Sequence, residues 1–309
     1  ASEANCQNLR CQTPLMLAAS HCQMARALET MKVLLESRAD VDRRDDLGWT
    51  ALMHACRNNN EESARLLLEQ RADVHAQATD GKTAAMLSAM EGGNKLIKHL
   101  SEKGVDIHAK DENGWTLLFF AVERSNKELM RWLLHMHAHP DISSAEQLTP
   151  LMLAAERGNT ELATLLLKYE ADPDAQDKDG ATALILALEA RQIEFADFLV
   201  EAGAECTVKT NQGHDAMEVA EKLGLMAVYY RIDMRLRREE RDGHGKNKKS
   251  ARGKGKKSNS PTSNSNSPKS NSPKSPKGAS PRSSPRGASP RTSPRGGASP
   301  RGGASPRGG

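Results

Sequence analysis

The chain has 309 residues, 37% of them hydrophobic and only 3% aromatic, so any core must be built from Leu, Ala, Val and Met. Its formal charge of +4 combines two opposite parts: residues 243–309 contain 16 Lys and Arg and no acid, whereas residues 1–242 contain 28 basic and 40 acidic residues, a net charge of −12. No apolar run approaches the roughly 18 residues that cross a bilayer, so we expect no membrane insertion.

The cysteines and the absence of secretion signals favour an intracellular protein. Five cysteines form no C-x-x-C pair and leave one unpaired, which is typical of reduced thiols. The first residues show no signal-peptide pattern, and no Asn-x-Ser/Thr acceptor occurs. We therefore expect a cytoplasmic protein, a nuclear one, or both. The first repeated unit is as apolar as an internal one, so we also expect missing upstream sequence.

A repeated unit begins with the string TPLMLAA, which stands at Thr13–Ala19 and again at Thr149–Ala155. Degenerate copies begin at Thr50, Thr83, Thr116 and Thr182, and Asp215 continues the series. From Thr50 onward each step is 33 residues; the first step is 37 because four residues are inserted between Ala19 and Asp40. A fixed period of this length indicates a stack of repeats rather than one globular core.

Each unit predicts a turn followed by two helices and a loop. Thr is a good N-cap for the first helix. The second helix carries a Leu ladder at Leu34, Leu67, Leu100, Leu133, Leu166 and Leu199, and a ladder of mostly acidic residues follows it at Asp40, Asp73, Asp106, His139, Asp172 and Glu205. Asp–Gly segments such as DDLGW and DENGW supply turn residues that adopt positive φ, as β-hairpins need.

These features resemble the ankyrin repeat. The family pattern D-x-x-G-x-T-P-L…A-A…LLL…AD is almost complete in Asp45–Val74 and Asp177–Ala204, and the resemblance covers about residues 9–240. It implies an all-α repeat solenoid of helix-turn-helix units with β-hairpin loops. We expect a solenoid domain over residues 1–242, with six full repeats near 9–44, 45–77, 78–110, 111–143, 144–176 and 177–209, a degenerate C-terminal cap at 210–242, and a disordered tail over 243–309.

No catalytic, metal or cofactor site survives inspection of the motifs, so we expect a protein that is not an enzyme. The alternating His135, His137 and His139 suggest a metal site, but Zn²⁺ prefers four ligands and no fourth is indicated. The repeat frame instead puts His137 where a left-handed Gly would end a helix, and His139 at the acidic ladder position. The segment DPDAQDKDG resembles a calcium loop, but, counted from Asp172, its sixth position is Asp177 where such a loop needs Gly, and no Glu stands at the twelfth. It occupies the frame of the hairpin turns instead. Cys56 stands at an Ala position and is predicted to be a small core residue.

The resemblance implies that partners bind through the hairpin tips and the exposed ends of the first helices, on a concave surface. The expected tip residues are Asp46, Leu47, Trp49, Thr79, Asp80, Lys82, Glu112, Asn113, Trp115, Glu146, Leu148, Lys178 and Asp179, and the expected helix-end residues are Arg57, Asn58, Met90, Glu91, Glu123, Arg124, Glu156, Arg157 and Glu189. Trp49 and Trp115 are either contact hot spots or packing residues of neighbouring hairpins. The acidic tips favour a basic or mixed-charge partner, although a solvated acidic face is the alternative.

The tail contains no apolar residue larger than Ala and cannot bury a core. Ten Ser-Pro pairs occur there, nine of them followed by Lys or Arg, which resembles sites of proline-directed kinases and the basic tails of linker histones. The expected phosphorylation sites are Ser260, Ser267, Ser272, Ser275, Ser280, Ser284, Ser289, Ser293, Ser299 and Ser305. The run Gly245–Lys257 is either a nuclear import signal or a solvated basic stretch.

The function that these expectations favour is that of a monomeric, non-enzymatic scaffold or adaptor that binds other proteins. One alternative is a nucleic-acid-associated protein whose basic tail supplies weak affinity. A salt titration separates the two, because a complex made by tail cations weakens steeply with salt. A second alternative is a regulatory fragment of a larger enzyme or channel.

Overall fold

The computed structural model describes residues 3–21 and 25–251, with side chains over 3–21 and 26–241. The described residues form helices and no strand: η1 (Glu3–Asn5), α1 (Pro14–Ser20), α2 (Ala25–Glu36), α3 (Ala51–Arg57), α4 (Glu61–Glu69), α5 (Ala84–Met90), α6 (Asn94–Glu102), α7 (Leu117–Glu123), α8 (Lys127–His135), α9 (Pro150–Arg157), α10 (Thr160–Lys168), α11 (Ala183–Glu189), α12 (Ile193–Ala202), α13 (Ala216–Lys222) and α14 (Met226–Ala251). The last helix continues to Ala251, past position 243, where the sequence predicts the tail to begin.

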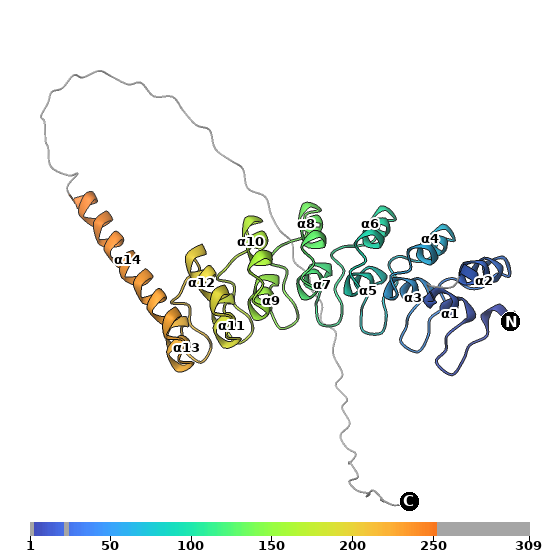
Figure 1. Cartoon of the computed structure of the whole chain (residues 1–309), viewed down its shortest axis with the longest axis horizontal. Helices are drawn as coiled ribbons and strands as arrows, with labels where there is room; N and C mark the ends of the chain where they lie inside the picture. The colour runs from blue at the N-terminus through green and yellow to red at the C-terminus, as the bar shows by residue number, and fades with distance from the viewer. Residues whose placement is uncertain (1–2, 22–24, 252–309) are drawn as a thin grey trace, which may run out of the picture. The chain divides into compact units, whose positions relative to one another are not determined.

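The helices lie in two parallel rows (Figure 1). The odd-numbered inner helices, α1 to α13, stack on one another in chain order, and each is packed against the even-numbered outer helix that follows it. The turn loops lie on the side of the inner helices. Because each unit packs mainly on its neighbours, the apolar core runs along the stack, as in a helical repeat solenoid.

The frame threonines begin the inner helices, as the sequence predicts. The hydroxyls of Thr13, Thr50, Thr83, Thr149 and Thr182 each accept the backbone N–H three residues on, and Asp215 does the same for α13. Thr116 holds the same position without that hydrogen bond. The Sδ atoms of Met16, Met86 and Met152 in turn accept the N–H of their capping threonine at 3.3–3.5 Å, so these buried methionines complete the cap.

The Leu ladder forms the buried side of the outer helices. Leu67, Leu100, Leu133, Leu166 and Leu199 are all 0% exposed, whereas Leu34 in the first unit is only half-buried. Trp132, beside the ladder on α8, is half-buried against the same core. Burial of this ladder removes apolar surface from water at every step of the stack and so stabilises it, together with the apolar side chains of the inner helices.

The expected hairpin loops form turns, but strand pairing is not part of them. We count five residues in each turn. The backbone N–H of the first residue donates to the backbone carbonyl of the fifth, as from Asp45 to Trp49 at 3.0 Å. The fourth residue has positive φ, as predicted, at Gly48, Gly81, Gly114, Gly180 and Gly213, and Gln147 takes this position in one turn. The described residues contain only one isolated antiparallel bridge, Gln77 with Thr83. The expectation of β-hairpins is therefore wrong in detail: beyond this bridge, the turns among the described residues have no flanking strand pairs, because each is followed at once by the N-cap and first turn of an inner helix.

The ends of the outer helices also adopt left-handed backbone. His137 has φ 62°, which confirms that it replaces a helix-stopping Gly. Arg38, Arg71 and Glu170 occupy the equivalent positions with φ of 61–64°. Residues other than Gly are sterically strained in the left-handed region of backbone conformation.

Gln147 stands where the turns approach one another most closely. A Cβ added at Gly81, Gly114 or Gly180 would lie 2.7–2.8 Å from the backbone nitrogen of the next turn. The turn-to-turn hydrogen bonds beside these glycines are 2.8–3.0 Å long, whereas the one beside Gln147, from Lys178 N to Glu146 O, is 3.2 Å. The Cβ of Gln147 therefore holds its neighbour slightly away.

We predict that Gln147→Gly stabilises the protein by about 0.5–1 kcal/mol, because it removes left-handed strain and allows closer approach at the cost of some backbone entropy. Thermal and urea unfolding measure the change. Glu170→Gly is the matched control, since the equivalent Gly104 and Gly203 have no atom within 4 Å of an added Cβ and only the strain is relieved there. A Gln147→Gly variant less stable than the wild type would contradict the steric argument.

We predict that Leu133→Ala lowers the free energy of unfolding by about 2–5 kcal/mol, because it leaves a cavity in the middle of the stack. Urea unfolding followed by circular dichroism measures the loss. Val33→Ala, on a side chain that is 60% exposed, serves as the control. Equal stability of the Leu133→Ala variant and the wild type would show that the ladder is assigned wrongly.

Candidate functional site

The predicted partner-binding residues lie on one surface, which we call the inner face: the turn tips together with the ends of the inner helices. On the tips, Asp46, Leu47, Thr79, Glu112, Asn113, Glu146, Lys178 and Asp179 are exposed, and Trp49, Asp80, Lys82, Trp115 and Leu148 are half-buried. At the helix ends, Asn58, Glu91, Arg124, Glu156, Arg157 and Glu189 are exposed, and Arg57, Met90 and Glu123 are half-buried. None of these side chains is withdrawn into the core.

Backbone hydrogen bonds align the turn tips along the inner face. The second residue of each turn donates its N–H to the third residue of the turn before it, as Thr79 does to Leu47 O, Glu112 to Asp80 O and Asn211 to Asp179 O, at 2.9–3.0 Å. The tips are thereby fixed relative to one another before any partner arrives. Such preorganisation lowers the entropic cost of binding.

Several predicted contact residues pair with one another across neighbouring units. Arg57 forms an ion pair with Glu91, and Lys178 with Glu146. Arg157 contacts Glu123 at 2.7 Å. Exposed pairs of this kind are worth little to stability, but they neutralise charges that the sequence alone would leave free. The sequence did not predict these pairings, because they join residues one repeat apart.

The acidic character of the inner face is concentrated at α9 to α11. Burial raises the pKa of Glu156, and the nearby Asp177 and Glu123 carboxylates add to the rise. Burial also raises the pKa of Glu189, with further contributions from Asp177 and Asp179. Among the described residues, neither glutamate has a cation in ion-pair contact, although Arg157 lowers the pKa of Glu156 in part. The negative charge here is therefore only weakly compensated.

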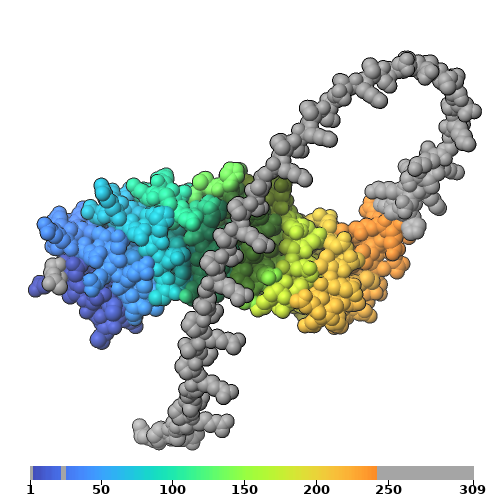
Figure 2. All heavy atoms as spheres, turned by 180° about the vertical axis from the view of Figure 1, so that it is seen from behind, coloured from blue at the N-terminus to red at the C-terminus, as the bar shows by residue number. Residues whose placement is uncertain are grey.

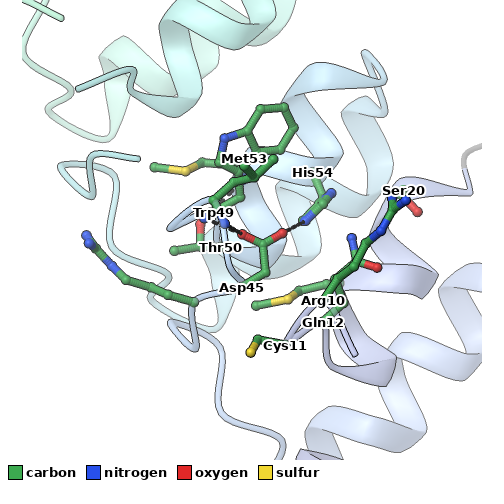
Figure 3. Close-up of polar contacts among 12 residues, drawn as sticks. Arg10, Cys11, Gln12, Ser20, Asp45, Trp49, Thr50, Met53 and His54 are labelled. Carbon is green, nitrogen blue, oxygen red and sulfur yellow. Dashed lines mark hydrogen bonds and ion pairs between the residues drawn. The ribbon is translucent and has the colours of Figure 1, made fainter. Parts of the chain in front are cut away.

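Trp49 is held in place by a buried polar contact (Figure 3). The Asp45 carboxylate accepts the N–H groups of Leu47 and Trp49 at 3.0 and 2.8 Å, and its second oxygen lies 2.9 Å from His54 Nε2. The Trp49 and His54 rings meet edge to face with centroids 5.3 Å apart. His54 is not among the predicted residues, and the only signal for it is a polar side chain at an inner-helix position that is apolar in the other units.

Trp115 is held by aromatic packing instead. Its ring stacks on Phe119 and meets Phe120 edge to face, both at 5.5 Å between centroids. Asp111 accepts the N–H of Trp115 at 2.8 Å, as Asp45 does for Trp49. Both tryptophans thus pack on their own unit and keep a partly exposed edge. Their contact with a partner stays a prediction.

The side chains of His135, His139 and Cys56 have structural surroundings. His139 Nδ1 accepts the N–H of Asp141 at 3.1 Å, the role that Asp73 plays for His75, and His135 contacts the Tyr169 hydroxyl. Over residues 3–21 and 26–241, no three His, Cys, Asp or Glu side chains are placed to hold a metal ion. Cys56 is fully buried, and burial raises the pKa of its thiol far above the usual range.

Some expectations cannot be placed in this structure. The ten Ser-Pro serines lie outside the described residues. Within the described part of the chain, no helix has both the length and the apolar character needed to cross a membrane.

Comparison with known proteins agrees with this geometry. The family model for ankyrin repeats (3 copies) matches residues 1–78, 70–145 and 136–210. The crystal structure of the ankyrin repeat domain of Bcl-3, described as a unique member of the IkappaB protein family, is 25% identical, covers 67% of this chain and 93% of its own, and superposes with a TM-score of 0.59. No curated protein sequence matches the chain. Since the family model spans more than half of the sequence, the chain belongs to the ankyrin-repeat family.

Proposed function

We propose that the protein is a non-enzymatic scaffold or adaptor that binds another protein through the inner face. The observation that carries the proposal is a row of turn tips fixed by backbone hydrogen bonds, on which Trp49 and Trp115 are rigid and partly exposed. Rigid aromatic residues are the commonest hot spots of protein interfaces. The similarity to the ankyrin repeat domain of Bcl-3 supports a binding role.

The partner that fits best has a basic or mixed-charge surface. Glu156 and Glu189 lie beside Asp177 and Asp179 without an ion-pair partner, so a cation placed there relieves their mutual repulsion. The already paired residues, such as Arg157 with Glu123, add both signs of charge around this cluster. A partner with Lys or Arg opposite α9 to α11 therefore gains complementarity that an acidic one lacks.

The remaining expectations complete this proposal. Six full repeats carry the inner face, and α13 with α14 forms the C-terminal cap of a monomer inside the cell. Phosphorylation of the Ser-Pro sites would add about −1.5 to −2 charges each to the basic tail. Weak nucleic-acid binding by that tail is the alternative function, and it rests on the 16 basic residues of the sequence from 243 to 309.

We predict that the double variant Glu156→Gln/Glu189→Gln binds basic protein partners about tenfold more weakly, a loss of ~1.4 kcal/mol. The full-length chain is immobilised, and the proteins it retains from a cell extract are quantified for variant and wild type. Both glutamates have a raised pKa, so on acidification they take up protons and lose their charge at a higher pH than ordinary glutamates do. The affinity of the wild type should therefore begin to fall at that higher pH.

The matched control is Glu62→Gln/Glu69→Gln, which removes two exposed carboxylates from the outer helix α4. It should leave the retained proteins unchanged. If both double variants lose the same proteins equally, the loss reflects net charge and the inner face is not the binding surface. Melting curves confirm that all variants are folded.

A further inference from the structure

A second surface with a different chemistry lies on the outer helices, away from the inner face. A groove of 410 Å³ runs between α8 and α10, which lie next to each other in the outer row (Figure 1). Figure 2 shows the same stack from behind. Grooves of this size are in the range that accommodates small ligands and short peptide segments.

The α8 side of the groove is a cationic stripe. Lys127, Arg131 and His135 follow one another at intervals of four residues, so they share one helix face. Lys127 is paired with Glu161 of α10 at 2.8 Å. Arg131 forms no ion pair with any other described side chain, and it is exposed. One unpaired guanidinium therefore lies in the middle of the groove.

The α10 side offers no counter-charge beyond Glu161. Thr164 and Leu165 line its middle, and Lys168 and Tyr169 line its end. Lys168, like Arg131, has no ion-pair partner among the described residues, and the Tyr169 hydroxyl lies 3.2 Å from His135 Nε2. With neutral histidine, the lining carries three cations and one carboxylate, a net charge of about +2.

The other outer grooves have fewer unpaired cations in their linings. Between α6 and α8, Lys98 is neutralised by Glu128 at 2.9 Å. Between α12 and α14, Arg231 contacts both Asp197 and Glu201 at 3.1 and 2.9 Å. The same groove is lined by Arg235, which is paired with Glu239 at 2.8 Å, and by Arg238, which is its one lining cation without an ion-pair partner among the described residues. The position of Arg131 in the repeat frame is held by Arg65 in α4, which is equally exposed but lines none of the described grooves. The α8–α10 groove thus combines two unpaired cations, Arg131 and Lys168, with a cavity.

We propose that this groove binds a phosphorylated peptide segment of a partner protein. A phosphoserine or phosphothreonine carries about −1.5 to −2 charges, which matches the net charge of the lining, and offers three acceptor oxygens to Arg131 on one wall and Lys168 on the other. Arg is well suited because its guanidinium binds phosphate in a bidentate manner. The half-buried Tyr169 ring supplies apolar surface for a residue beside the phosphate, which a free anion would leave unused.

The phosphate belongs near the middle of the groove rather than at the end of the helices. The last carbonyl groups of α8 and α10 carry partial negative charge and repel an anion. Arg131 lies a full turn before that end, whereas His135 and Lys168 are the last residues of their helices. Arg131 is therefore the anchor, and Lys168 reaches toward the same anion from the opposite wall.

Fluorescence anisotropy of the full-length chain tests the proposal, with a labelled short peptide of Gly and Ala around one phosphoserine as the probe. At physiological salt we expect the phosphopeptide to bind at least about tenfold more tightly than the same peptide with unmodified serine. Arg131→Ala and Lys168→Ala should each weaken binding about tenfold, with melting temperatures unchanged. Arg65→Ala, at the same frame position two repeats earlier, should have no effect.

Three results would overturn the proposal. Equal losses in Arg65→Ala and Arg131→Ala would show non-specific attraction to the outer helices. Undiminished binding in both groove variants would assign the affinity to the basic tail. Inorganic phosphate that competes as well as the phosphopeptide, at equal concentration, would identify a free-anion site and exclude a peptide as the occupant.

Discussion

The backbone hydrogen bond between successive turns is the constraint on which the rest of the structure depends. The second residue of each turn donates to the third residue of the turn before it, from Asp46 near the N-terminus to Asn211 beside α13, at 2.8–3.2 Å. The bond requires two backbones to approach closely. Close approach is possible only if the fourth residue of the turn is Gly, which has no Cβ, or a residue that tolerates strain there. This geometry accounts for the glycine that recurs in the sequence with the 33-residue period.

Two properties of the inner face follow from this constraint. Equivalent side chains recur in rows, so that charges one repeat apart meet as ion pairs, as Arg157 does with Glu123. The tips are also held independently of any ligand, so the half-buried Trp49 and Trp115 present a fixed edge. In the part of the chain that the structure describes, no backbone hydrogen bond joins one outer helix to the next. The surfaces of the outer helices therefore differ from groove to groove according to the charges that face each other.

The sequence predicts well those features that depend on the residues of a single repeat. Thr50 caps a helix, Leu133 fills the core and His137 ends a helix in left-handed backbone, and each of these follows from a local pattern. The features it could not predict depend on which residues meet across units. The contact of His54 with Asp45 required knowing that the turn folds back onto its own helix, and the pairing of Arg57 with Glu91 required the stacking geometry. The strands were predicted wrongly because a positive-φ Gly marks a turn equally well with or without flanking strand pairs.

Native-state hydrogen exchange of the turn amides tests the central role of the turn-to-turn bond most directly. If these bonds fix the stack, the amides of Thr79, Glu112 and Ala145 should exchange only through the opening that also exposes the inner helices, with protection similar to that of the adjoining helix amides. Exchange of these three amides at the rate of an unstructured peptide, while the inner helices stay protected, would contradict the account.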